Sequence, residues 1–105
     1  MKYVILVTDE KELGFSRVYP FIFPEYVVHE HVAEHMVHLL GMEEDKDSTV
    51  LSAGFCHLHN GEWQTEHGSE SLGIARDHRK GHRDHKILNM PNAMQGIMFD
   101  GVEHA

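Results

Sequence analysis

The sequence predicts an α+β fold: a small antiparallel sheet of four to six strands, packed against one main helix and a shorter C-terminal helix. Three observations lead to this prediction. The segment 28–40 repeats its apolar residues with helical spacing. Several shorter apolar segments have the patterns of strands. The dipeptide Asn60-Gly61 is a strong signal for a tight turn between antiparallel strands. At 105 residues, the chain is expected to form a single domain over residues 1–105.

Two strands are expected before the main helix. Residues 3–8 form an uninterrupted apolar run rich in β-branched side chains, which is typical of a buried strand. Residues 17–23 alternate, include aromatic side chains and contain Pro20. Because proline has no N–H to donate to a neighbouring strand, Pro20 predicts that this second strand lies at an edge of the sheet.

The helix predicted at 28–40 has an apolar side and a histidine-rich side. The side chains expected to face the sheet are Val28, Val32, Met36, Leu39 and Leu40, with Ala33 and Val37 widening the stripe. The opposite side carries Glu30, His31, Glu34, His35 and His38. Gly41 follows the last periodic residue, where a left-handed residue commonly ends a helix.

Residues 49–59 and 62–66 are expected to pair as a hairpin. A two-residue turn at Asn60-Gly61 sets the register, with His59 opposite Glu62 and Cys56 opposite Thr65. One face of the hairpin is assigned to the core and carries Cys56, Leu58, Trp63 and Thr65. The other face is assigned to solvent and carries His57, His59, Glu62, Gln64 and Glu66.

The remaining segments are expected to be an acidic loop at 42–48, a short strand at 69–75, a helix at about 79–90, a loop at 91–96 and a last strand at 97–99. The helix ends in apolar residues that can pack on the sheet. Gly81 weakens its first turn, because glycine is a poor helix former.

The composition excludes some classes of function. The formal charge of -8 argues against general binding to nucleic acid or to anionic membranes. With all eleven histidines protonated, nine basic residues and seventeen acids would leave +3, so mild acid changes the sign of the charge. No apolar run approaches the roughly 20 residues of a membrane span, and the run at the start is too short for a signal peptide. The single Cys56 fits a reducing cytoplasm.

A basic segment predicts an anion site. Residues 76–86 hold five of the nine basic residues of the chain. The predicted site, for phosphate or a nucleotide, is built from Arg76, Arg79, Lys80 and Arg83. The alternative is a solvated basic segment that offsets acids elsewhere, including across a homodimer.

Histidine spacing raises a second hypothesis, a zinc or similar divalent metal site. His31 and His35 lie four residues apart on the predicted helix, and His57 and His59 lie on one side of a predicted strand. A metal there could support a small hydrolase with Glu34 or Glu62 as base. The alternative interpretation is that the histidine-bearing faces of this helix and this strand are exposed to solvent and bind no metal.

Three segments are distinctive when taken together: residues 18–33, which contain Pro20-Phe21-Ile22-Phe23-Pro24, residues 52–55, and residues 68–76. In that spacing they resemble a family of small proteins of unknown function encoded by tailed phages and prophages. The third segment departs from the family, because Asp77 follows Arg76 where a proline is often found. The resemblance implies an accessory protein in the bacterial host cytoplasm that acts by binding, for example to a host protein. It transfers no catalytic residue.

The sequence therefore favours a non-catalytic binding module for an anionic ligand or a host protein, needing no cofactor. The alternative is a histidine-ligated zinc protein or metal-dependent hydrolase. Whether the protein is an enzyme stays open, and a homodimer is expected to be possible because a small sheet with exposed edges can be covered by a second copy.

Overall fold

The computed structural model describes residues 1–10, 15–41, 49–90 and 97–99. Its strands are β1 (Lys2–Glu10), β2 (Phe15–Phe23), β3 (Val50–His59), β4 (Glu62–His67) and β5 (Ile97–Phe99), and its helices are α1 (His29–Leu39) and α3 (His78–Leu88). The strands form one antiparallel sheet in the order β4-β3-β1-β2-β5. The predicted α+β fold, with its main helix and its C-terminal helix, is confirmed.

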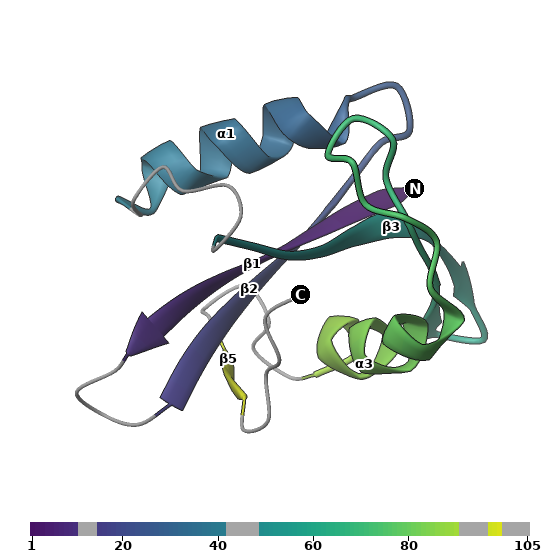
Figure 1. Cartoon of the computed structure of the whole chain (residues 1–105). Coiled ribbons are helices and arrows are strands. Elements are labelled where there is room, and N and C mark those ends of the chain that lie inside the picture. Colours follow the sequence, from purple (N-terminus) through teal and green to yellow (C-terminus); the bar gives the residue numbers. More distant parts are fainter. Residues whose placement is uncertain (11–14, 42–48, 91–96, 100–105) are drawn as a thin grey trace.

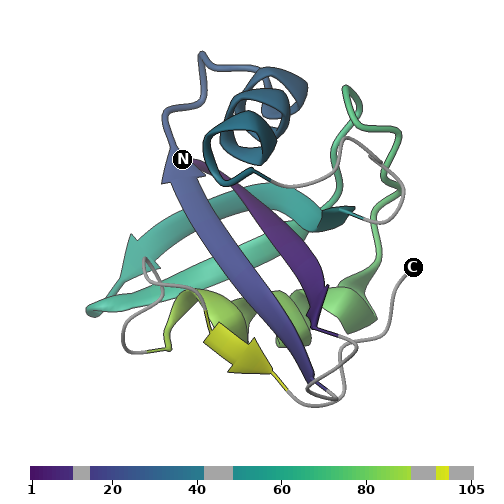
Figure 2. The same cartoon turned by 90° about the vertical axis from the view of Figure 1, so that its left-hand side faces the viewer.

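The two helices lie on opposite faces of the sheet (Figures 1 and 2). The central strand β1 is consequently buried on both faces, which explains its uninterrupted apolar run. Its side chains alternate between two cores. The core under α3 contains Tyr3, Ile5, Val7, Val18, Leu51, Cys56, Ile87 and Leu88. The core under α1 contains Val4, Leu6, Phe23, Ala33, Val37 and Ala53.

Helix α1 uses a different face from the one that its periodicity predicts. The row that meets the sheet is His29, Ala33 and Val37, whereas Val32 and Met36 pack at its side. Of the predicted core residues, Val28, Leu39 and Leu40 are exposed, Leu39 at 63%. Because His29 hydrogen-bonds to the backbone of β3 and Ala33 is small, this row can approach the sheet closely. Gly41 ends the helix in the left-handed conformation, as predicted (φ +66°).

The β3–β4 hairpin has the predicted register. His59 pairs with Glu62 and Cys56 with Thr65, and both turn residues, Asn60 and Gly61, have positive φ. Cys56 is buried and Trp63 packs against the same core. The assignment of Leu58 to the core is wrong: it lies two residues nearer the turn, outside the cluster, and is 60% exposed.

At the β4 edge of the sheet, a side chain occupies backbone groups that could otherwise pair with another strand. On β4, the side-chain amide of Asn89 accepts from the N–H of Trp63 (2.8 Å) and donates to its carbonyl (3.0 Å). On β2, the pairing with β5 covers Ser16–Val18 within the described residues. The edge-strand prediction is therefore wrong for the start of β2, but Pro20 lies beyond the described pairing with β5, where its missing N–H is tolerated.

The predicted helix at 79–90 is observed as α3, and the predicted last strand is β5. The short strand predicted at 69–75 is wrong. A single bridge joins Ser69 and Ile74 and closes a tight turn, with Gly73 at φ +67°. The loops expected at 42–48 and 91–96 lie outside the described residues. No helix in the described part of the chain is long and apolar enough to cross a membrane.

Candidate functional site

One loop, residues 68–77, connects β4 to α3 and contacts the first turns of both helices. The Oγ of Ser71 accepts a hydrogen bond from the N–H of Glu30 in α1 (3.3 Å). The carboxylate of Asp77 accepts from the N–H of Arg79 and caps α3 (3.0 Å). The two helices lie on opposite faces of the sheet, but both begin at the same end of it, next to this loop (Figure 1). Two positive helix ends therefore lie at one end of the molecule.

The two ends of this loop come very close together at Gly68. Gly68 has φ +136°, and a Cβ there would lie 3.3 Å from the Cα of Arg76. The backbone of Ser69 bonds in both directions to that of Ile74 (2.9 and 2.8 Å). The glycine therefore lets Arg76 return to the start of the loop, where its guanidinium pairs with Glu66 of β4.

Three of the four residues predicted to bind an anion line one hollow of about 600 Å³ at the start of α3. We call it the basic hollow. Its lining residues are His67, Gly73, Ile74, Ala75, Arg76, Asp77, His78, Arg79 and Lys80. The fourth predicted residue, Arg83, does not line it. The side chain of Arg83 points inward, with its guanidinium 3.5 Å from the carbonyl oxygen of Leu51.

The described lining of the basic hollow holds more positive than negative charge. The lining has three cationic side chains, those of Arg76, Arg79 and Lys80, and one carboxylate, that of Asp77. The N–H and the guanidinium of Arg79 hold the pKa of Asp77 below its ordinary value, so this carboxylate stays ionised. Arg79 is paired with Asp77 (3.4 Å). The local excess of positive charge contrasts with the formal charge of -8 for the chain.

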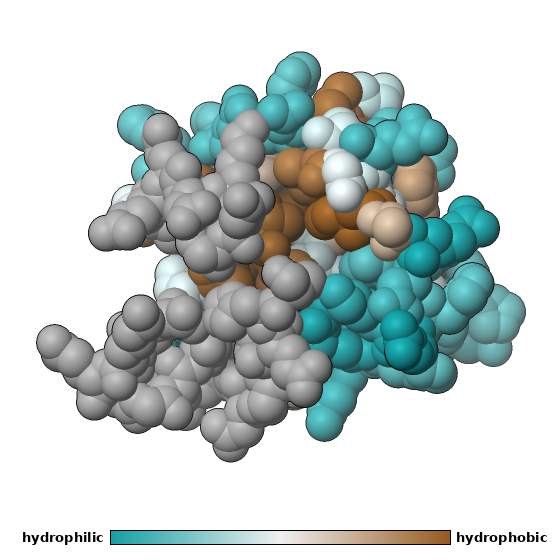
Figure 3. Space-filling model, in the orientation of Figure 1, coloured by the Kyte–Doolittle hydropathy of each residue, from teal (hydrophilic) through white to brown (hydrophobic). Residues whose placement is uncertain are grey.

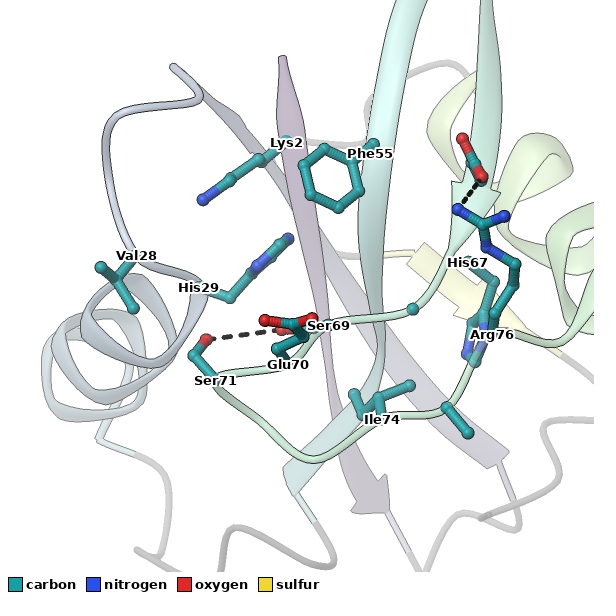
Figure 4. Close-up of a pocket in the computed structure, with 13 residues that line it drawn as sticks. Lys2, Val28, His29, Phe55, His67, Ser69, Glu70, Ser71, Ile74 and Arg76 are labelled. Carbon is teal, nitrogen blue, oxygen red and sulfur yellow. Dashed lines mark hydrogen bonds and ion pairs between the residues drawn. The ribbon is translucent and has the colours of Figure 1, made fainter.

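A larger hollow of about 930 Å³ lies between the start of α1 and the loop 68–77, and we call it the aromatic groove. Its lining residues are Lys2, Val28, His29, Phe55, Glu66, His67, Gly68, Ser69, Glu70, Ser71, Ile74, Ala75 and Arg76. Figure 4 draws Lys2, Phe55 and His29 on one side, and the loop with Glu70 facing them. The groove and the basic hollow share four residues: His67, Ile74, Ala75 and Arg76.

On the sheet side of the groove, His29 is positioned by one hydrogen bond and two ring contacts. The Nε2–H of His29 donates to the carbonyl of Gly54 (2.8 Å), and the ring meets Phe23 and Phe55 edge-on. Burial lowers the pKa of His29 and so favours the neutral ring. Lys2 donates from Nζ to the carbonyl of Val27 (3.1 Å) and lies 5.8 Å from the centre of the Phe55 ring.

The three segments that carry the resemblance meet at this groove. Its lining comes entirely from residues 18–33, 52–55 and 68–76, apart from Lys2, Glu66 and His67. Sequence reasoning missed the groove, because Lys2, His29 and Phe55 are brought together by the sheet and not by spacing. The three segments of the resemblance were the feature of the sequence that could have indicated the groove.

A buried polar cluster behind the site was also missed. Asp84 of α3 is fully buried and accepts hydrogen bonds from the hydroxyls of Tyr3 and Ser52. Burial and the neighbouring Asp84 raise the pKa of Tyr3 far above its ordinary value, so Tyr3 remains a donor. The signal was present: Asp84 lies three and four residues before the buried Ile87 and Leu88, on the same face of the helix.

The histidines proposed as metal ligands lie on two exposed surfaces. His31 and His35 are on the outer side of α1, and His57 and His59 are exposed on β3. No three side chains of His, Cys, Asp or Glu are grouped to hold an ion within the described ranges. Of the two candidate bases, Glu62 pairs with Nε2 of His85 (2.6 Å), and Glu34 is exposed on α1. The zinc site and the hydrolase stay predictions.

Comparison of the chain with protein-family models, with curated proteins and with solved structures finds no match.

Proposed function

We propose that this protein is a binding module that holds a small anionic ligand, of the phosphate type, in the basic hollow. The observation that carries this proposal is that Arg76, Arg79 and Lys80 surround one hollow at the first turn of α3. Guanidinium groups bind phosphate through charge-assisted hydrogen bonds. The positive end of the adjacent helix favours the same charge. The proposal assigns no reaction to the protein.

The pairs that the arginines make within the chain are compatible with this role. Arg76 and Arg79 face Glu66 and Asp77 across exposed ion pairs. Such pairs contribute little to stability, so a ligand can compete for the arginines at small cost. Lys80 adds a third positive charge to the lining. A bound phosphate would therefore find pre-positioned cations.

The resemblance to phage and prophage accessory proteins supports a binding role, because its segments gather around the groove that adjoins the hollow. On this proposal the protein acts in the bacterial host cytoplasm. A host protein that carries an anionic group would bind the same cationic residues as the small ligand.

Calorimetric titration with inorganic phosphate, pyrophosphate and sulfate tests the proposal. We expect saturable binding that weakens as salt is added, because exposed charges are screened. The double variant Arg79→Ala/Lys80→Ala is expected to weaken binding at least about tenfold, since each cation contributes charge-assisted hydrogen bonds.

The matched control is Lys86→Ala, which removes a positive charge from the same helix but lies outside both hollows. The affinity of this variant is expected to stay within about twofold of the wild type, because Lys86 lines neither hollow and the effect of its charge is screened. Absence of binding to all three anions, or equal loss in the control and the double variant, would contradict the proposal.

A further inference from the structure

The basic hollow and the aromatic groove adjoin each other, and we treat them as two halves of one site because four residues line both. His67, Ile74, Ala75 and Arg76 line both. Their volumes, about 600 and 930 Å³, are of the size that proteins use for small organic ligands, and each far exceeds what a phosphate ion needs. A ligand that fills the site is therefore an organic anion with a sizeable body.

The groove offers an aromatic face to that body. Phe55 points into it and is 44% exposed, an unusual state for a phenylalanine in a sheet that is otherwise well packed. Val28 and Ile74 add apolar surface. In Figure 3, hydrophilic side chains cover α3, and hydrophobic ones gather between α3 and α1. A planar ring against Phe55 would bury this surface.

The polar groups of the groove define the rest of the ligand. Glu70 faces the groove from the loop, next to the hydroxyls of Ser69 and Ser71 (Figure 4). A carboxylate repels a second anion and accepts hydrogen bonds from ring N–H or amino groups. The anionic end of the ligand therefore belongs in the basic hollow, and hydrogen-bond donors belong near Glu70.

The shared wall contains a polar atom that the fold leaves unsatisfied. His67 is 5% exposed, and its Nδ1 is buried without a hydrogen-bond partner among the described residues. Such groups are rare in folded proteins and commonly mark a ligand or an ordered water. A ligand that crosses from one hollow to the other passes this imidazole.

We infer that the ligand is an aromatic monophosphate of the mononucleotide class, with its phosphate at Arg76, Arg79 and Lys80 and its base against Phe55. This inference rests on the proposed function and adds the second half of the site. A nucleotide combines the three required parts: a phosphate, a planar ring and ring-bound hydrogen-bond donors. The formal charge of -8 disfavours a polynucleotide in the same site, because its further phosphates would be repelled.

Calorimetry with the four nucleoside 5′-monophosphates, ribose 5-phosphate and inorganic phosphate tests the inference. We expect the tightest mononucleotide to bind at least about tenfold more strongly than ribose 5-phosphate, the scale of one base–aromatic stacking contact. Phe55→Ala is expected to remove this advantage while leaving the affinity for ribose 5-phosphate unchanged. Phe55→Leu, which keeps apolar bulk on β3, is expected to do the same and guards against a folding defect.

The control is Leu58→Ala, a truncation of an exposed residue on the same strand outside both hollows. It is expected to leave every affinity unchanged. If ribose 5-phosphate binds as tightly as the mononucleotides, the inference is overturned and the proposed function stands. If none of the phosphates binds, both fall. A Phe55→Leu variant that is folded and keeps the tenfold advantage also overturns the inference.

Discussion

Asp84 is the residue on which the α3 side of the molecule most depends. It is fully buried, and its Oδ2 accepts hydrogen bonds from the hydroxyls of Tyr3 and Ser52. Its Oδ1 lies 3.5 Å from Nε of Arg83, within ion-pair distance but without hydrogen-bond geometry. A charge so deeply buried is tolerated only when its partners are in place. The cluster therefore joins α3 to β1 and β3.

Asp84→Ala is expected to destabilise the fold by about 3–5 kcal/mol, because it leaves the buried hydroxyls of Tyr3 and Ser52 without their acceptor and removes the carboxylate beside the Arg83 guanidinium. Urea unfolding followed by circular dichroism measures this change. Glu70→Ala, which truncates an exposed carboxylate, is the control and is expected to stay within about 0.5 kcal/mol of the wild type. Equal stability of the two variants would show that the Asp84 cluster is not structurally important.

Glu66 competes with any anionic ligand for Arg76. Their side chains form an exposed ion pair at the wall shared by the groove and the hollow. Glu66→Gln removes the competing charge and keeps the size of the side chain. We expect phosphate to bind a few-fold more tightly to this variant, with little change in stability, since an exposed pair contributes about 0–1 kcal/mol. An unchanged or weakened affinity in calorimetry would mean that Arg76 does not contact the anion.

At the scale of elements, helix α1 shows where periodicity is ambiguous. Two adjacent rows of its surface are apolar, and the sheet selects the row of His29, Ala33 and Val37. Val37→Ala is expected to destabilise the protein by about 1.5–3 kcal/mol, because that side chain is buried in the core under α1. Leu39→Ala, on the same helix, is expected to change stability by less than about 0.5 kcal/mol. Thermal unfolding of both variants measures the difference, and a larger effect at Leu39 would mean that the helix packs by its other row.

Elements whose form is decided locally were predictable. The turn at Asn60-Gly61 fixes the β3–β4 register through its own backbone preference, and Gly41 ends α1 for the same reason. The continuous apolar run of β1 required a strand buried on both sides. The loop 68–77 was misjudged because its shape depends on the crossing of Gly68 with Arg76 and on caps to both helices. The cap of α3 by Asp77 is local, but no local pattern encodes the crossing at Gly68 or the contact of Ser71 with α1.

The candidate site was half predictable for a similar reason. Arg76, Arg79 and Lys80 lie within five positions of one another in the basic segment, so the sequence alone could group them into one predicted anion site. Lys2, His29 and Phe55 come from three separate elements, and only the strand order brings them together. Arg83 was included by charge alone, yet helical rotation turns its side chain toward the interior, next to Asp84.

At the scale of the whole molecule, the histidines that the structure describes differ in burial. Most of them are exposed, but His29 and His67 are buried, and burial lowers the pKa of both. For His67 the nearby Asp84 and Asp77 oppose this shift, whereas Lys80 and Arg83 reinforce it. A histidine whose pKa is lowered by folding binds a proton more readily in the unfolded chain. Each of the two therefore destabilises the fold as the pH falls below about 6.5, the pKa of a histidine in the unfolded chain. Above that pH its contribution is constant.

The stability of the wild type is therefore expected to decrease between about pH 7 and pH 5, by at most about 1.4 kcal/mol per pH unit for each buried histidine. The variant His67→Gln keeps a polar side chain of similar length and cannot titrate. Its stability is expected to fall less steeply than that of the wild type over the same range. Urea unfolding at several pH values compares the two slopes. Identical slopes would mean that His67 is not held neutral in the fold.

The most direct test of the binding site is a ¹H–¹⁵N correlation spectrum of the labelled protein, recorded while inorganic phosphate is added. The proposal predicts that the amide signals of Arg76, Asp77, His78, Arg79 and Lys80 move together and saturate, whereas those of β2 and of the α1 C-terminus stay in place. Signals that do not move, or that move mainly around residues remote from the start of α3, would contradict it.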